Sequence, residues 1–285
     1  MSTVAYEIVD VFTDRPFAGN PLAVVYGADS LAADQMHALA REFNLAETIF
    51  ILNPAAVGAT YRVRIFTTEG EIPFAGHPSV GAAVSLMRRG DVRPGTVVQE
   101  CGAGLLPIEV TAAGSATLTG GTPVLGEPIA HEPLLTGLGL TAADYAGGEA
   151  AAARSAGCGL DWVFLPVRRD ALARLRRPTD GPDVCVFAWA EGVAHARVFV
   201  PGDAVWEDPA TGSAALGLGV WLVASSRLPG DGVSSYLVHQ GHEMNRPSLL
   251  ECTVTAAGGA AVSATVSGHV VPIASGRIAV PPFVG

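Results

Sequence analysis

The spacing of apolar residues in the first part of the chain predicts alternating strands and helices. Residues 6–12 and 22–26 are rich in β-branched and aromatic side chains and flank the turn-forming segment TDRPFAGNP, which predicts a strand, a loop and a second strand. Apolar residues then recur at helical spacing over residues 31–43, which predicts a helix with Asp29 or Ser30 as its cap. The chain therefore opens as a meander followed by a helix.

The same rhythm continues into a second helix. Residues 47–52 and 61–66 are predicted as strands, and residues 67–74 as a loop. Residues 78–89 are predicted as a helix because they are largely apolar and are followed by a glycine, with two arginines in the last turn.

A change in composition near the middle of the chain marks the predicted boundary between two domains. At 285 residues the chain exceeds the usual size of a single hydrophobic core. Residues 114–133 are rich in glycine and proline and lack periodicity, so we place the crossover there. We expect an N-terminal domain over residues 1–120 and a C-terminal domain over residues 121–285, with the last strand, about 276–285, as a candidate to rejoin the first domain.

The second half shows a similar series of elements. Residues 161–167 and 197–200 are predicted as strands, and residues 209–225 as a second long apolar helix. Short predicted strands with glycine-rich turns complete the chain: residues 234–238, 249–254, 262–266 and 277–280.

The two long helices begin with similar segments, GHPSVGAA and EDPATGSAA. When the second half of the sequence is aligned with the first so that Asp208 matches His77, three pairs of identical residues also match: Pro78 with Pro209, Gly81 with Gly212 and Ala83 with Ala214. This match predicts an internal duplication, and a chance match in an Ala/Gly-rich chain is the alternative.

Composition and charge narrow the class of protein. Hydrophobic residues make up 49% of the chain and charged residues 15%, which indicates a compact globular protein. The net charge of −10, without a Lys/Arg-rich block, argues against nucleic acid as a partner. The N-terminal residues lack the pattern of a signal peptide, and no apolar run reaches the ~20 residues that span a bilayer. We therefore expect a cytoplasmic protein without membrane contact.

The cysteines are scattered along the chain. No CxxC pattern and no Cys/His cluster brings together Cys101, Cys158, Cys185 and Cys252. We expect buried free thiols and no metal site.

The starts of the two long helices pose a chemical problem. Both helices are apolar on nearly every side, so we expect them to be buried, and each carries a proline at its predicted first position. A buried helix start leaves its first N–H groups unpaired and carries the positive end of the helix dipole. A substrate carboxylate can accept those hydrogen bonds, and Gly76, Gly81 and Gly212 would let it approach the backbone closely.

Three polar residues stand at these helix starts, and each has a structural interpretation beside the functional one. Asp208 precedes a proline and is also an ordinary N-cap, a role compatible with substrate binding. His77 is a poorer cap and therefore more informative, although a neutral structural histidine is equally consistent. Ser213 offers a hydroxyl in the first turn, where serine is common. The residues alone leave both interpretations open.

Glu47 is the remaining candidate for proton chemistry. It stands at the start of an apolar strand, in phase with Ile49 and Ile51, so it is expected to face a core. Apolar surroundings disfavour the charged form of a carboxyl group and raise its pKa from about 4.3 toward a range useful for proton transfer. A solvent-exposed glutamate at a strand edge is the alternative.

Taken together, the motifs resemble the PhzF-like family of phenazine-biosynthesis isomerases, which is similar in fold to diaminopimelate epimerase. The motifs that carry this resemblance are VDVFTDRPFAGNPLAVV (9–25), NLAETIFI (44–51), RIFTTEGEIPFAGHPSVGAA (64–83), EDPATGSA (207–214) and QGHEMNRPS (240–248). The resemblance implies an α+β fold of two pseudo-symmetric domains, each a curled, mostly antiparallel sheet around a central apolar helix. It also implies an active site in a cleft between the domains.

The resemblance further implies residue roles and a reaction. Glu47 falls on the catalytic general acid/base, and His77 and Asp208 fall on the other catalytic positions. Gly76, Gly212 and Ser213 then bind the substrate carboxylate. The family-naming enzyme isomerises trans-2,3-dihydro-3-hydroxyanthranilate by moving hydrogen between ring carbons. The family is expected to need no metal or organic cofactor and commonly forms homodimers.

Two other interpretations are carried forward. An amino-acid racemase or epimerase of this type would need two opposed bases, usually cysteines at the two helix starts, where none stands here. The other interpretation is a protein that binds small acids without catalysis, because Thr68 and Asn245 depart from the usual family pattern near the expected pocket.

Overall fold

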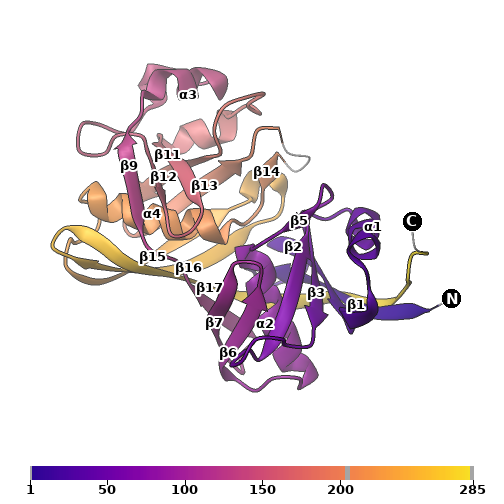
Figure 1. Ribbon diagram of the computed structural model, residues 1–285. Helices are drawn as coiled ribbons and strands as arrows, with labels where there is room; N and C mark the ends of the chain where they lie inside the picture. The colour runs from indigo at the N-terminus through magenta and orange to yellow at the C-terminus, as the bar shows by residue number, and fades with distance from the viewer. Residues whose placement is uncertain (1, 203–205, 283–285) are drawn as a thin grey trace. The chain divides into compact units, whose positions relative to one another are not determined.

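The protein consists of two compact units (Figure 1). The computed structural model describes residues 2–202 and 206–282. Unit 1 comprises Met1–Leu118 and Ser267–Gly285, and unit 2 comprises Thr119–Val266. The C-terminal segment in unit 1 starts earlier than the expected 276–285, because β17 (Ala260–Ala279) already pairs with β1 (Thr3–Val11) from Val270 onward.

Strands dominate unit 1. After β1, its strands are β2 (Asn20–Tyr26), β3 (Glu47–Leu52), β4 (Tyr61–Phe66), β5 (Glu71–Ile72), β6 (Gly95–Cys101), β7 (Gly104–Val110) and β8 (Ser115–Thr119). β1 pairs with β2 and β3 with β4 in antiparallel fashion, whereas the β2–β3 and β4–β6 pairs are parallel. β6, β7 and β8 continue the sheet, and both β8 and β1 pair with β17. The sheet therefore wraps into a barrel-like arrangement.

The α2 helix (Gly76–Arg89) packs against this sheet, and α1 (Ala33–Phe43) lies beside β3 and β4 (Figure 1). α2 is buried from His77 to Leu86 and contacts β1, β2, β3 and β7. Gly81 permits this close packing, because a Cβ there would collide with Leu22. α2 ends at Gly90, whose φ of 80° and bonds to the last carbonyls confirm the predicted C-terminus.

Unit 2 is also strand-rich. Its strands are β9 (Val124–Pro128), β10 (Arg154–Gly157), β11 (Asp161–Pro166), β12 (Val184–Ala190), β13 (Val193–Phe199), β14 (Glu207–Asp208), β15 (Gly232–Gln240), β16 (Ser248–Ala257) and the first part of β17. The β11–β12 and β13–β15 pairs are parallel, and the β9–β10, β10–β11, β12–β13 and β15–β16 pairs are antiparallel. The α4 helix (Gly212–Ala224) contacts β9, β10, β11 and β16.

A further core in unit 2 involves the segment that contains α3 (His131–Gly137). Leu135 and Leu138 from this segment pack with Leu172 of the 3-10 helix Arg169–Arg174 and with Leu165 and Val186 of the sheet. The helix α3 was not predicted, because its short span leaves little room for a helical repeat of apolar residues.

Several predicted boundaries are wrong. The cap of α1 is Ala32 rather than Asp29 or Ser30, and the Gln35 side chain accepts a bond from its N–H. The expected loop at 67–74 contains the short strand β5. The strands expected separately at 262–266 and 277–280 are parts of the single strand β17. Within residues 2–202 and 206–282, no helix combines the length and the apolar character needed to cross a membrane.

Candidate active site

Glu47 lies at the start of β3 in unit 1. Its neighbour Thr48 is fully buried, and the Glu47 side chain is 19% exposed. The preceding helix α1 ends at Asn44, whose left-handed conformation (φ 51°) turns the chain toward β3. β3 then pairs in parallel with β2, with Glu47 opposite Leu22. This local structure holds a carboxyl group at the edge of a core, as the strand pattern predicted.

His77 lies beside this carboxyl group. It is the second residue of α2, and its side chain is 5% exposed. His77 Nε2 lies 3.4 Å from Glu47 Oε2. On the other side of the ring, His77 Nδ1 lies 3.2 Å from Nδ2 of Asn20, the fully buried first residue of β2. The start of a helix and the starts of two parallel strands thus bring three polar side chains together.

The environment defines the protonation state of His77. Burial lowers the pKa of His77 to about 3, so the ring is neutral at physiological pH. The amide nitrogen of Asn20 can only donate, so Nδ1 accepts and Nε2 carries the hydrogen. The contact with Glu47 is therefore between a neutral imidazole N–H and a carboxyl group, and it is not a salt bridge.

The first turn of α2 presents backbone donors. No side chain caps the helix at Ala75. Ser79 donates both its N–H and its hydroxyl to the Ala75 carbonyl oxygen, at 3.3 and 2.8 Å, and Pro78 has no N–H. The geometry of a helix start leaves the N–H groups of Gly76 and His77 without an acceptor inside the helix. These are the donors that an anion would use.

In unit 2, Asp208 belongs to a compact polar network. Its carboxylate accepts a hydrogen bond of 2.5 Å from the Thr211 hydroxyl. Gln240, at the end of β15 and 1% exposed, donates to the Asp208 carbonyl at 2.6 Å and to the Thr211 hydroxyl at 2.9 Å. Its side-chain oxygen accepts the Thr211 N–H at 3.2 Å. Gln240 thereby fixes the segment between Asp208 and α4.

Ser213 is the second residue of α4. Its hydroxyl oxygen accepts a hydrogen bond of 3.0 Å from the indole N–H of Trp162, which leaves the hydroxyl hydrogen free to be donated elsewhere. Gly212 is the first residue of this helix, and no side chain caps it at Thr211. The start of α4 thus also presents backbone donors.

The predicted helix starts at Pro78 and Pro209 are wrong. α2 begins earlier, at Gly76, and α4 begins later, at Gly212. Asp208 lies on the short strand β14, which pairs with β13, so it is extended and is not the N-cap of α4.

The predicted equivalence of His77 and Asp208 changes as a consequence. When each helix is numbered from its first residue, His77 corresponds to Ser213, and Gly76 corresponds to Gly212. Asp208 instead corresponds to Ile72 of β5, since these two residues hold matching positions in the short strands that pair with β4 and β13.

Two buried amides in this region were not assigned a role from sequence. Asn20 and Gln240 both lie inside the quoted motifs, but their contacts with His77 and Thr211 join segments far apart in the chain. Asn245, which departs from the usual family pattern, has a positive φ of 56°, a conformation that asparagine tolerates better than most residues.

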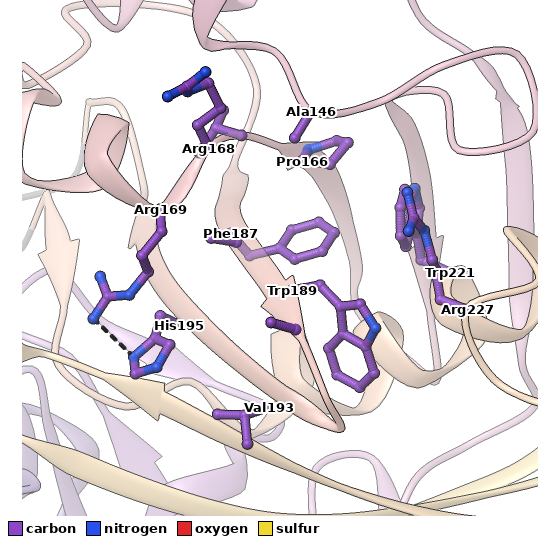
Figure 2. Close-up of a pocket in the computed structure, with 13 residues that line it drawn as sticks. Ala146, Pro166, Arg168, Arg169, Phe187, Trp189, Val193, His195, Trp221 and Arg227 are labelled. Carbon is purple, nitrogen blue, oxygen red and sulfur yellow. Dashed lines mark hydrogen bonds between the residues drawn. The ribbon is translucent and has the colours of Figure 1, made fainter.

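The remaining candidate chemistry is limited. All four cysteines are free, and Cys158, Cys185 and Cys252 are buried as expected, whereas Cys101 is half-buried. Burial raises the pKa of Cys158 to about 11. Across the described ranges, no group of three or more His, Cys, Asp or Glu side chains is arranged to hold a metal ion. A cavity of about 450 Å3 in unit 2 (Figure 2) is lined by none of the predicted site residues.

Comparison with known proteins gives the family. A family model described as phenazine biosynthesis-like protein matches residues 9–276. An uncharacterized isomerase of Mesorhizobium japonicum is 36% identical over 98% of this chain and 99% of its own length. A trans-2,3-dihydro-3-hydroxyanthranilate isomerase of Pseudomonas aeruginosa is 32% identical over 95% of this chain and 98% of its own length.

A solved structure agrees with these matches. The crystal structure of a PhzF-family phenazine biosynthesis protein from Bacillus anthracis is 25% identical and gives a TM-score of 0.86 over 98% of this chain and 100% of that chain. The fold is thus that of the PhzF-like proteins, mostly strands with few helices and a sheet that wraps like a barrel. With relatives named as isomerases across its length, the chain is an isomerase. It belongs to the phenazine biosynthesis-like, or PhzF-like, family.

Proposed function

We propose that this isomerase moves a proton between carbon atoms of a small cyclic carboxylic acid such as trans-2,3-dihydro-3-hydroxyanthranilate, with Glu47 as the general acid/base. The observation that carries the proposal is the 3.4 Å approach of His77 Nε2 to Glu47 Oε2 at the start of a buried helix. The named activity of the Pseudomonas aeruginosa relative supports the choice of substrate.

The proposed step is a proton transfer through one carboxyl group. The Glu47 carboxylate takes a proton from one ring carbon, and the electron pair of that C–H bond enters the conjugated system of the substrate. The resulting Glu47 carboxylic acid returns the proton to another carbon, so no atom is gained or lost overall. His77, whose neutral ring is held by Asn20 and lies 3.4 Å from Glu47 Oε2, is proposed to position the Glu47 carboxyl group.

We propose that backbone N–H donors bind the substrate carboxylate. The N–H groups at the start of α2, beginning with Gly76, can hydrogen-bond a carboxylate and carry the positive end of the helix dipole. In unit 2, we propose that Gly212 and Ser213 provide donors in the same way. Asp208, supported by Thr211, is proposed to orient the polar substituents of the substrate.

Isotope exchange tests the role of Glu47. Proton NMR of the dihydroaromatic acid in deuterated water should show deuterium entering the ring with the unmodified enzyme. Glu47→Gln should lower the rate by at least about 100-fold, since general acid/base groups contribute 10²–10⁴-fold, while substrate still binds. Glu42→Gln, an equal change at an exposed site on α1, is the matched control.

The possible outcomes separate the alternatives. Turnover by Glu47→Gln at the rate of the control would refute the role of Glu47. Binding of acids by the unmodified chain with no deuterium incorporation across a panel of dihydroaromatic and amino acids would favour a small-acid-binding protein. Exchange at the α-carbon of an amino acid would favour a racemase, although the second residues of the two helices are His77 and Ser213 rather than cysteines.

We further propose that the two units are structural repeats, each with a central helix, in the manner of diaminopimelate epimerase. Their strand pairings follow the same order of antiparallel and parallel neighbours, as β1, β2, β3, β4 and β6 in unit 1 and β10, β11, β12, β13 and β15 in unit 2. An arginine–glutamate pair, Arg64–Glu71 or Arg197–Glu207, links the matching short strand in each unit.

The proposal also includes a homodimer in the cytoplasm and a reaction without metal or organic cofactor. Membership of the family supports the dimer and the reaction without a cofactor. Light scattering of the purified protein tests the dimer, and turnover after dialysis against a chelator tests the second part.

A further inference from the structure

A cavity in unit 2 lies away from the residues discussed above (Figure 2). It has a volume of about 450 Å3, within the range of small-molecule pockets. β11 pairs with β12 only as far as Pro166 opposite Phe187, and residues 188–190 of β12 continue past this point into the cavity lining. The cavity reaches Trp221, about 14 Å along the α4 axis from Gly212 at the helix start. It is therefore separate from the donors proposed to bind substrate.

The charged residues around this cavity are all basic. Arg168, Arg169 and Arg227 line it together with His195, and no aspartate or glutamate does. This is unusual for a chain with 27 acidic and 17 basic residues. Arg168 pairs with the exposed Asp170, but no ion pair joins Arg169 or Arg227 to another residue in the part of the chain that the structure describes.

The arginine and histidine on one side of the cavity are organised by a hydrogen bond. Arg169 Nη2 donates to His195 Nδ1 at 3.1 Å (Figure 2). Burial and the neighbouring Arg169 charge lower the pKa of His195 to about 4, so the ring is neutral at physiological pH. Because Nδ1 accepts, Nε2 carries the hydrogen. The side chains of both residues are thus available as donors.

Aromatic rings form the apolar part of the lining. Phe187 is fully buried and meets Trp221 edge-on at 5.0 Å, and Trp189 is half-buried two residues further along β12. Figure 2 shows Phe187 and Trp189 in the middle of the lining, with Arg169 on one side and Arg227 on the other. Flat apolar surfaces beside unpaired guanidinium groups suit a ligand with a planar ring and an anionic group.

We propose that this cavity is a second ligand site that binds a small aromatic carboxylic acid. The ring would lie against the half-buried Trp189, and the carboxylate would accept hydrogen bonds from Arg169, with the charge of Arg227 adding to the positive field of the cavity. Arginine suits this role because its planar fork binds a carboxylate through two parallel hydrogen bonds. The site is independent of the proposed function, since it shares no residue with the group around Glu47.

Calorimetric titration of the full chain with benzoate tests the proposal. We expect saturable binding, with benzamide, the neutral isostere, binding at least about tenfold more weakly, because a charged hydrogen bond is lost. The double substitution Arg169→Gln and Arg227→Gln should weaken benzoate binding by about tenfold or more. Arg93→Gln with Arg277→Gln, an equal loss of two charges at exposed sites of unit 1, should leave it unchanged.

The following results would overturn the proposal of a second ligand site. Absence of saturable benzoate binding in the millimolar range, or equal binding of benzamide, would overturn the proposal. Unchanged benzoate binding in the doubly substituted protein, checked for an intact unfolding transition, would place the ligand elsewhere and also overturn it. Loss of turnover in that protein, with benzoate competing against substrate, would show that the ligand occupies the catalytic site instead. Failure of the Glu47→Gln test has no bearing on these outcomes.

Discussion

The ion pair between Arg197 and Glu207 has a solvent-exposed counterpart in the same protein. Arg197 Nε and Nη2 each lie 2.8 Å from an oxygen of Glu207, and the two side chains are 8% and 5% exposed. In unit 1, Arg64 Nε lies 2.7 Å from Glu71 Oε1 in the same bidentate arrangement, with exposures of 30% and 41%. Each pair links a long strand to its short neighbour, so geometry is matched and burial differs.

The burial of each pair should determine how much folding stability is lost when its glutamate is neutralised. Glu207→Gln leaves the Arg197 charge buried without a counterion, and Arg197 is also held by a 2.9 Å bond to the Leu172 carbonyl. Removing one partner of a buried pair costs about 3–5 kcal/mol. Glu71→Gln acts on an exposed pair, so water solvates the remaining charge and the cost should be at most about 1 kcal/mol.

Urea unfolding followed by circular dichroism and tryptophan fluorescence measures both losses. Trp206 and Trp221 lie in unit 2 and report on the unit that contains Glu207. Equal losses for the two substitutions, or a loss below about 1 kcal/mol for Glu207→Gln, would refute the reasoning from burial. A double substitution, Arg197→Met with Glu207→Leu, should recover much of the stability, because no charge then remains buried.

Three further predictions follow from single residues. The folded-state pKa of His77 is lowered to about 3 against about 6.5 when unfolded, so stability should fall as pH drops below about 6.5, by roughly 1 kcal/mol per pH unit. His77→Gln should flatten this dependence in urea titrations between about pH 5 and 7, and an unchanged slope would contradict the assignment. Gly81→Ala should cost about 1–3 kcal/mol, seen as a lower Tm, because the added methyl collides with Leu22. Asn245→Ala should cost about 1 kcal/mol at its φ of 56° while Asn245→Gly stays near neutral, and equal stabilities would argue against backbone strain.

Local pattern was sufficient to predict some of the strands but not the helix starts. The strands Glu47–Leu52 and Tyr61–Phe66 match their predictions because short apolar or alternating runs are bounded by polar residues or turns. The helix starts were placed by the preference of proline for the first helical position. In the structure Pro78 is the third residue of α2, and Pro209 lies before α4 because Asp208 pairs with β13. At Pro209, pairing between two strands that are neighbours in the chain therefore overrides the local preference.

The candidate site was likewise predictable from the sequence only in part. Glu47 and His77 were singled out by residue type and motif, but their 3.4 Å contact depends on how β3 and α2 pack in unit 1. Asn20 and Gln240 carry no distinguishing pattern, since a buried amide and an exposed one look alike in sequence. Only the fold shows that each bonds a predicted site residue or its neighbour.

The proposed chemistry explains why unit 1 would hold a substrate carboxylate with backbone donors. A cationic side chain within about 4–6 Å lowers the pKa of a nearby carboxyl group and makes it a weaker base. His77 avoids this effect, because burial keeps its ring neutral, and the N–H groups of Gly76 and His77 carry only the partial charge of a helix start. A substrate anion can thus be bound beside Glu47 without a full positive charge competing for the carboxylate. No proton transfer is proposed at the cavity in unit 2, so the full charges of its arginines weaken no catalytic base.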